Sequence, residues 1–240
     1  MQKFTFFSLS LALLLGALLA TSCDRSNIHQ VISTLTETPA DTTGFARKDL
    51  RMSSFAAVEV DCFADVSFFQ TAPGELPRLV LMAPAEVLDN VIARASEGVL
   101  RVSINHRYRM PDKAVLVAKV YAPHVNRIEM NGGKCLRIAS ETVNCPVEIT
   151  TNGLGAVLAD SVKAPEIRVK ANGAGSVRMK GIATSKLSVK SNGAGEVVLA
   201  GRCDSGRVEI NGAGLLDVRS LDVTSKSLQL ETAGVGKVLR

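Results

Sequence analysis

Large aromatic side chains are scarce in this sequence. Aromatic residues make up 4% of the 240 residues, with no Trp and two Tyr. A core with so few rings has to be narrow and filled by small and β-branched side chains. No long helical pattern of apolar residues follows residue 100, which excludes a helical bundle for the C-terminal half.

Residues that carry catalysis or bind metals are also few. The three histidines, His29, His106 and His124, are expected to have surface or local structural roles. Acidic residues do not recur at one position of the repeat described below, no nucleophile motif is present, and an active site needs such groups to converge. We therefore predict no catalytic residue, no metal site, no cofactor and no enzymatic activity. The alternative, a carbohydrate-cleaving enzyme, requires acidic residues clustered on one face of the fold.

Cysteine is used sparingly. The five cysteines are Cys23, Cys62, Cys135, Cys145 and Cys203, and their spacing fits no zinc-binding pattern. In an exported protein the last four can form disulfides, in pairings that sequence does not rank. Buried free thiols and a single bridge, such as Cys135 to Cys145, are the alternatives that stay open.

The N-terminus carries an apolar run of the kind found in secretory signal peptides. Lys3 precedes a stretch that is too short to cross a bilayer of about 30 Å comfortably and ends in small residues, which predicts a signal peptide over residues 1–22. Ala20-Thr21-Ser22-Cys23 resembles a bacterial lipobox, which implies lipidation of Cys23; a plain secretory peptide that leaves Cys23 free is the alternative. Residues 23–46 are rich in Ser, Thr, Asp and Pro, so we expect the lipidated Cys and a flexible tether there.

A repeat of about twenty residues is the strongest pattern in the chain. It is marked by Asn-Gly-Ala-Gly or a close variant, and the asparagines are spaced 21, 20, 20 and 19 residues apart. They are Asn131, Asn152, Asn172, Asn192 and Asn211. An alternating apolar pair precedes each motif and another follows it, such as Ile167/Val169 and Val177/Met179. Each repeat is therefore predicted to hold at least two short strands with inward residues at period two.

The strands of one repeat cannot bury their apolar side alone. Winding each repeat into one coil lets equivalent strands pair in parallel about 4.7–4.9 Å apart and stacks the inward residues into a continuous core. We therefore predict an all-β fold in which residues 126–240 form a right-handed parallel β-helix-like solenoid with coils of about 20 residues.

The Asn-Gly-Ala-Gly motif is predicted to build the corner of each coil. Its glycines supply positive-φ or closely packed positions, and stacked asparagines can form an amide ladder. The glycines expected at these corners are Gly153, Gly155, Gly173, Gly175, Gly193, Gly195, Gly212 and Gly214. A phosphate-binding loop is disfavoured because strands and not a helix follow the glycines, and a calcium-binding array is disfavoured because no Asp follows them.

Residues 47–125 lack the motif and are predicted to be the strand-rich N-terminal part of the same β body, with one short helix. Phe55–Asp61 and Ala64–Gln70 are expected to be two strands paired with each other. Apolar residues within Val87–Ile92 fall at helical spacing, and Gly98 is placed to end that helix. Further strands are predicted at Leu79–Met82, Val99–Ile104 and Ala114–Tyr121.

The ordered set of features resembles a known family. The set comprises the strand Val58–Asp61, the strand Asp65-Val66-Ser67-Phe68, the helix before Gly98-Val99-Leu100-Arg101-Val102, Tyr121-Ala122-Pro123 at a strand end, and the Asn-Gly repeats. Over residues 47–240 it is similar to the exported Gram-negative lipoproteins described as putative auto-transporter adhesin, head GIN domain. The resemblance implies a β-solenoid fold, placement at the cell surface or in the periplasm, and adhesion. One departure is that the sequence stops soon after the last motif, which makes a final strand short.

Outward strand positions are the expected place for ligand contacts. Arg168, Lys170, Arg178, Lys180 and Lys190 can align into a basic strip that binds acidic glycans or lipopolysaccharide through bidentate Arg contacts. The alternative is a solvated charged face that keeps a strand-rich surface from aggregating.

The predicted function is that of a non-enzymatic cell-envelope lipoprotein, anchored to the outer membrane through its N-terminal lipid and facing the surface or the periplasm. It would act as an adhesin or interaction module for a glycan, a lipid, or a host or envelope protein. The alternative is a periplasmic protein that binds lipid or glycan, or senses envelope stress, without adhesion. The net charge of +5 is mild and dispersed, so no nucleic-acid partner is expected. A homo-oligomer is an open alternative.

Overall fold

The computed structural model describes residues 36–112, 114–139 and 145–240. The predicted signal peptide and Cys23 lie outside the described residues. The described fold is all-β with one short helix, α3 (Ala85–Asp89), which confirms the predicted class. In this part of the chain no helix has the length and hydropathy needed to cross a membrane.

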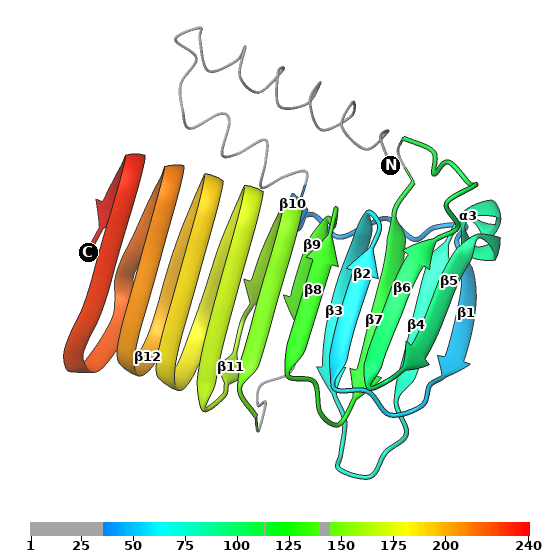
Figure 1. Cartoon of the computed structure of the whole chain (residues 1–240), viewed down its shortest axis with the longest axis horizontal. Helices are drawn as coiled ribbons and strands as arrows, with labels where there is room; N and C mark the ends of the chain where they lie inside the picture. Colours follow the sequence, from blue (N-terminus) through cyan, green and yellow to red (C-terminus); the bar gives the residue numbers. More distant parts are fainter. Residues whose placement is uncertain (1–35, 113, 140–144) are drawn as a thin grey trace, which may run out of the picture. The chain divides into compact units, whose positions relative to one another are not determined.

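Strands β1 to β7 form the N-terminal part of the body, and β8 to β12 contain the repeats (Figure 1). The first group is β1 (Ala46–Arg51), β2 (Ala57–Asp61), β3 (Ala64–Gln70), β4 (Arg78–Ala83), β5 (Val91–Ser96), β6 (Val99–Ile104) and β7 (Leu116–Ala122). The second group is β8 (Arg127–Asn131), β9 (Cys135–Ile138), β10 (Val147–Ala159), β11 (Val162–Lys163) and β12 (Glu166–Leu239). β12 is one long paired segment that passes through several motifs.

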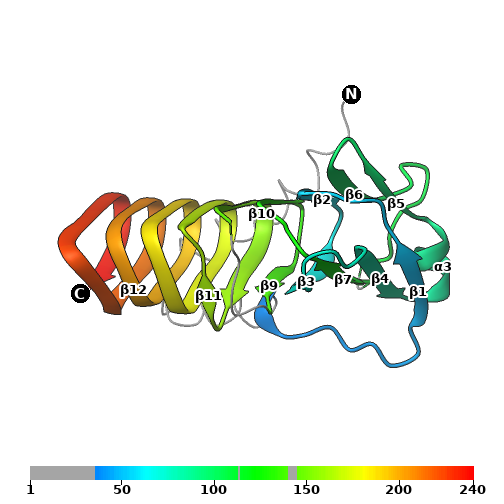
Figure 2. The ribbon, with the colours of Figure 1, turned by 90° about the horizontal axis from the view of Figure 1, so that it is seen from below.

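Successive repeats lie side by side in parallel. β10 pairs with the start of β12 from Val147 with Ile167 to Ala159 with Met179, a constant offset of 20 residues. On its other edge β10 pairs in parallel with β8 and β9, the two strands of the preceding repeat. Figure 2 shows the chain winding through these repeats, each beside the last. The offset equals the repeat length because each strand pairs with its equivalent in the next repeat.

The inward residues of the repeats form one apolar core. In the repeat around Asn172 the pair before the motif and the pair after it are all 0–1% exposed: Ile167, Val169, Val177 and Met179. The core continues into the N-terminal part, where Leu79, Leu100 and Leu116 are fully buried. Burying a side chain of this size stabilises the fold by about 1.5–3 kcal/mol, so the period-two apolar pairs position the strands.

The sheet is mixed. β2 pairs in parallel with β6 and β8, and β3 pairs in parallel with β7 and β9. The pairs β1–β4, β4–β7 and β5–β6 are antiparallel. The antiparallel pairs belong to the end of the body that lacks the repeat, where β5 and β6 are joined by a tight hairpin and not by a coil.

The predicted pairing of the two strands after residue 55 is wrong. Both strands form, as β2 and β3, but neither pairs with the other. β2 aligns with β8 before a corner, so that Asp61 follows the position paired with Met130, and β3 aligns with β9 after that corner. The chain turns at the corner between β2 and β3. Each of the two strands therefore pairs with the equivalent strands of the neighbouring layers and not with the other.

The predicted helix is shorter than its apolar spacing indicates. α3 ends at Asp89, and Val91 and Ile92 belong to β5. Gly98 does not end the helix; Glu97 and Gly98 have φ values of 53° and 73° and form the two-residue turn between β5 and β6. Positive φ at both central residues is what a type I′ hairpin turn requires, so strand pairing overrides the local helical pattern.

Candidate functional site

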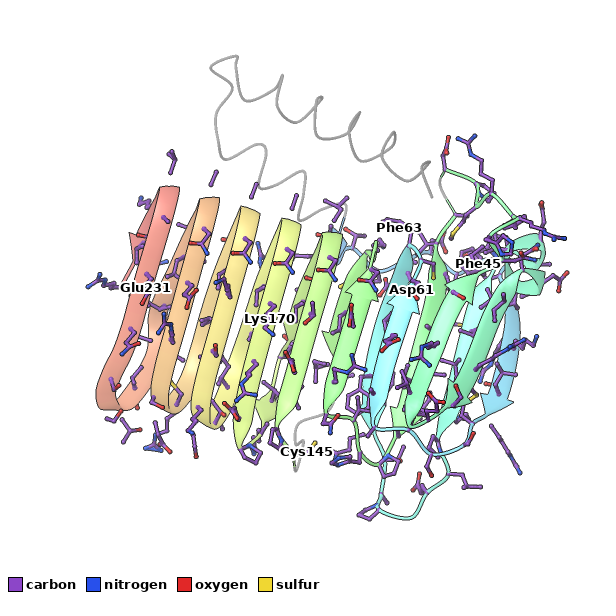
Figure 3. The ribbon with its side chains drawn as sticks, in the orientation of Figure 1. Phe45, Asp61, Phe63, Cys145, Lys170 and Glu231 are labelled. Atoms are coloured by element: carbon purple, nitrogen blue, oxygen red, sulfur yellow. The ribbon has the colours of Figure 1, made fainter. Side chains whose placement is uncertain are left out.

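The motif asparagines form a hydrogen-bonded column across the repeats. In each bond the Nδ2 of one asparagine donates to the Oδ1 of the asparagine one repeat earlier. The bonds join Asn152 to Asn131 (2.7 Å), Asn172 to Asn152 (2.9 Å), Asn192 to Asn172 (2.8 Å) and Asn211 to Asn192 (2.9 Å). Asn131 donates in turn to Oδ1 of Asp61 on β2 at 2.7 Å. Figure 3 labels Asp61. The column therefore ties neighbouring layers of the body together.

The motif glycines lie where repeats approach each other most closely. Gly173 has a φ of 124°, and a Cβ built on it would overlap the carbonyl oxygen of Gly153. A Cβ on Gly175 would overlap the carbonyl oxygen of Gly155. The remaining motif glycines with such close contacts are Gly193, Gly195, Gly212 and Gly214. The hollow beside these glycines has a volume of about 10 Å³, which holds about one water molecule.

The five basic residues of the predicted strip all belong to β12 but lie on opposite sides of the motif corners. Arg168, Lys170 and Lys190 precede the motif of their repeat, whereas Arg178 and Lys180 follow it, beyond the corner. The motif corner separates the two sets. Residues before the corner can therefore align only with residues before the corner in other repeats, and residues after it only with residues after it.

Four of these five cations are held by carboxylates. The pairs are Arg168 with Glu166 (2.8 Å), Lys170 with Glu148 (2.7 Å), Arg178 with Glu196 (2.5 Å) and Lys190 with Glu209 (2.9 Å). Figure 3 labels Lys170 on β12. The hydrogen bond from Lys170 holds the pKa of Glu148 below its usual value. Most positive charge on these strands is therefore compensated by carboxylates of the same or neighbouring repeats.

A buried charged cluster lies on the outer side of β3 and β9. Asp65 is 4% exposed and forms ion pairs with Arg137 and, at 3.7 Å, with Lys134. The backbone N–H of Ala40 also donates to Oδ2 of Asp65 at 3.2 Å. A carboxylate this deeply buried is stable only when it is paired and hydrogen-bonded.

Residues 36–45 lie against this cluster. The carbonyl oxygens of Glu37 and Thr38 accept hydrogen bonds from the two cations of the cluster at 2.5 and 2.6 Å. The Glu37 carboxylate accepts a hydrogen bond from Oγ of Ser176 at 2.6 Å and contacts Arg178 at 3.3 Å. Figure 2 shows the segment running from beside β9 to the start of β1. The described part of the expected tether is therefore in contact with the folded body.

Three cations that pair with no carboxylate of the described residues lie together on β1, β4 and β7. Arg51 is directly opposite Arg78, and Arg78 is opposite Tyr121, so their side chains share one face. Lys119 is on the same face two residues before Tyr121. The Arg78 Cζ is 4.3 Å from the centroid of the Tyr121 ring, which stacks on Phe69 at 4.8 Å and 12°. We name these five residues the cation–aromatic surface.

Sequence reasoning missed both the buried cluster and the cation–aromatic surface. Ala40 reaches Asp65 across 25 residues, and Arg51 reaches Arg78 through strand register. No spacing along the chain marks such contacts. The one sequence signal was Asp65 itself, an acidic residue inside an otherwise apolar strand.

The described cysteines are free thiols. Cys62, Cys135, Cys145 and Cys203 form no disulfide. Burial raises the pKa of Cys135 to about 12 and that of Cys62 to about 12. Of the two alternatives left open by the sequence, free thiols or a single bridge, the structure contains the free thiols. Over the described ranges, no group of three His, Cys, Asp or Glu side chains is placed to hold a metal ion.

Solved structures share this fold at low sequence identity. A structure named a putative adhesin from Bacteroides fragilis NCTC 9343 has a TM-score of 0.62 at 15% identity, covering 81% of this chain and 95% of that chain. One named a putative adhesin from Parabacteroides distasonis ATCC 8503 has a TM-score of 0.69 at 14% identity, covering 81% and 80%. A third, named a putative lipid binding protein from the same strain, has a TM-score of 0.56 at 14% identity, covering 82% and 97%.

The family is shown by the sequence itself. No curated protein matches the chain. The family model described as "Putative auto-transporter adhesin, head GIN domain" matches residues 54–239, which is most of the chain. The chain therefore belongs to the putative auto-transporter adhesin, head GIN domain family.

Proposed function

We propose that this chain is a non-enzymatic lipoprotein of the cell envelope that serves as an adhesin or interaction module. The observation that carries the proposal is the family match over residues 54–239, because that family is described by an adhesin head domain. The signal-peptide pattern and the lipobox-like residues ending at Cys23 support export and attachment to the outer membrane through a lipid.

The architecture supports a binding module in a physical sense. Inward residues of the stacked strands fill the core, and outward side chains of the repeats such as Arg168 and Lys170 are exposed. Such a body presents its outer strand positions on rigid elements, which favours precise contacts with a partner. The basic residues Arg168, Lys170, Arg178, Lys180 and Lys190 remain a proposed contact for acidic glycans, and their ion pairs equally support a role in holding repeats together.

We also infer that the repeats form a right-handed β-helix-like solenoid. The constant 20-residue offset and the asparagine column support it. Stability of such a body is a sum over repeats and their interfaces. Deleting residues 172–191, one whole repeat, should therefore leave a shorter folded protein, whereas deleting residues 172–181 should unfold the C-terminal repeats. Circular dichroism and limited proteolysis compare the two deletions, and equal damage by both contradicts the solenoid.

The placement of the protein is tested on intact cells. Metabolic labelling with a tagged palmitate should mark the parent chain and not Cys23→Ser. Added protease should cut a surface-exposed chain on intact cells, and the purified mature chain should then bind host cells or glycans. The proposal is contradicted if Cys23→Ser loses the label but stays attached to the membrane. It is also contradicted if the purified chain binds no cell and no glycan.

The second candidate is a periplasmic protein that binds lipid or glycan without adhesion. It is supported by the name of one structural neighbour, a putative lipid binding protein. The same protease experiment separates the two, because a periplasmic chain is cut only after the outer membrane has been permeabilised.

A further inference from the structure

The cation–aromatic surface holds like charges in an arrangement that the fold itself does not favour. Arg51 and Arg78 are directly opposite each other on antiparallel strands. Side chains in such positions have Cβ atoms about 4.5–5.5 Å apart, and like charges there are destabilising. Neither residue, nor Lys119, forms an ion pair with a carboxylate of the described residues. Asp49, on the same strand as Arg51, is paired with Arg47 at 3.0 Å.

Cations on neighbouring strands elsewhere in the body share a carboxylate. Arg101 on β6 and Arg127 on β8 flank Glu59 on β2, and each contacts that carboxylate at 2.9 Å. The strand between them therefore supplies the negative charge. On β1, β4 and β7 the one carboxylate is Asp49, which shares a face with Arg51 but is paired with Arg47. The charge of the three cations is therefore available to a ligand.

The surface is also ordered before any ligand arrives. The Tyr121 ring, stacked on Phe69, supports the guanidinium of Arg78 by a cation–π contact at 4.3 Å. A guanidinium presents its N–H donors in a planar fork that fits a carboxylate, phosphate or sulfate group in a bidentate manner. With strands about 4.8 Å apart and two residues spanning about 6.7 Å, Arg51 and Lys119 are roughly 12 Å from each other.

We propose that the cation–aromatic surface binds an acidic glycan, meaning a saccharide chain that carries carboxylate, phosphate or sulfate groups. The proposal rests on the proposed function as an interaction module and names its ligand class and site. Three cations spread over the flat face of a sheet suit an extended polyanion. A membrane is a poorer partner: Leu76, 72% exposed in the loop before β4, is next to Glu75, whose charge opposes approach to anionic lipid.

The test measures binding of the mature chain to dextran sulfate, with neutral dextran of the same length as the uncharged probe. We expect dextran sulfate to bind with an affinity that falls as salt rises, and neutral dextran not to bind. The variant Arg51→Gln/Arg78→Gln/Lys119→Gln should bind at least about tenfold more weakly. Tyr121→Leu should weaken binding roughly three- to fivefold, because the Arg78 guanidinium loses its ring support.

A charge-matched control removes three exposed cations that belong to no proposed site. Lys163→Gln/Lys186→Gln/Lys237→Gln should stay within about twofold of the parent. Thermal melts of every variant show that binding is compared between folded proteins. Equal weakening by the two triple variants overturns the proposal, because attraction would then depend on net charge alone.

Three further results decide between partners. Loss of binding in Lys170→Gln/Lys180→Gln/Lys190→Gln, with none in the first triple variant, overturns the proposal in favour of the repeats. Capture by vesicles containing phosphatidylglycerol, without binding to dextran sulfate, overturns it in favour of lipid. If the parent chain adheres to cells but does not bind dextran sulfate, this inference is refuted and the proposed function as an adhesin stands. If the first triple variant no longer binds dextran sulfate but still adheres to cells, the glycan site is supported and adhesion uses other contacts.

Discussion

The close approach of repeats at the motif glycines predicts a large difference between two substitutions that look alike. Gly155→Ala and Gly175→Ala add the same methyl group at the same motif position, and neither residue has a left-handed φ. A Cβ on Gly155 would be 3.6 Å from the carbonyl oxygen of Gly133, an ordinary contact. A Cβ on Gly175 would overlap the carbonyl oxygen of Gly155. The pair therefore isolates the steric effect of stacking.

The magnitude follows from the hydrogen bonds between repeats. Removing the overlap at Gly175 requires neighbouring strands to separate by about 1 Å or more, beyond the range in which N–H···O bonds hold. Losing two or three such bonds, each worth about 0.5–1.5 kcal/mol net, lowers the free energy of unfolding by about 2–4 kcal/mol. At Gly155 the alanine restricts the unfolded chain and changes stability by no more than about 1 kcal/mol, in the stabilising direction.

Urea unfolding of the mature chain, followed by circular dichroism, measures the difference. Gly175→Ala should lower the midpoint and Gly155→Ala should keep or raise it, at similar slopes. If the two midpoints agree within error, close packing of the glycines does not explain why the motif recurs.

Three other perturbations test the column, the thiols and the buried cluster. Asn172→Ala removes hydrogen bonds on both sides and should cost about 1–3 kcal/mol, roughly twice the effect of Asn211→Ala, which donates a single bond in the column; equal urea midpoints contradict this. Because burial raises the pKa of Cys135 from 9.0 to about 12, iodoacetamide should label it about a thousandfold more slowly at pH 8 than an exposed thiol. The native state keeps that proton between pH 9 and 12 while the unfolded chain releases it, so this thiol should make stability fall as pH rises through that window; fast labelling at pH 8 disproves the burial. Asp65→Ala removes the carboxylate partner of the buried Lys134 and of the partly exposed Arg137, and it should cost about 3–5 kcal/mol. Asp49→Ala, in an exposed pair, should change stability by less than about 1 kcal/mol; similar melting temperatures for the two variants contradict a stabilising role of the cluster.

Local patterns predicted the repeats better than the N-terminal part. The alternation Ile167/Val169 and Val177/Met179 is a property of a few consecutive residues, and both pairs are buried in the strands that it indicates. Helical spacing at Val91 and Ile92 was misleading because pairing of β5 with β6 outweighs a weak local preference. Gly98, which local helical spacing places as a helix stop, instead forms the hairpin turn with Glu97.

The candidate sites divide in the same way. The sequence predicted a basic strip from outward positions of single strands, but it carries no information on which carboxylate a cation meets. Register pairs Lys170 with Glu148 and leaves Arg51 facing Arg78. These outcomes depend on neighbours 22 and 27 residues away along the chain.

The period of the body, its inward residues and its small corner residues are encoded locally, because repetition and alternation are properties of neighbouring positions in the chain. Tertiary contacts set the divergence of β2 and β3, the position of residues 36–45 against the outer side of β3 and β9, and which cations of the described residues have no carboxylate partner. The physical reason is that burial and charge compensation depend on the side chains of adjacent strands. Strand register, and not distance along the chain, selects those side chains.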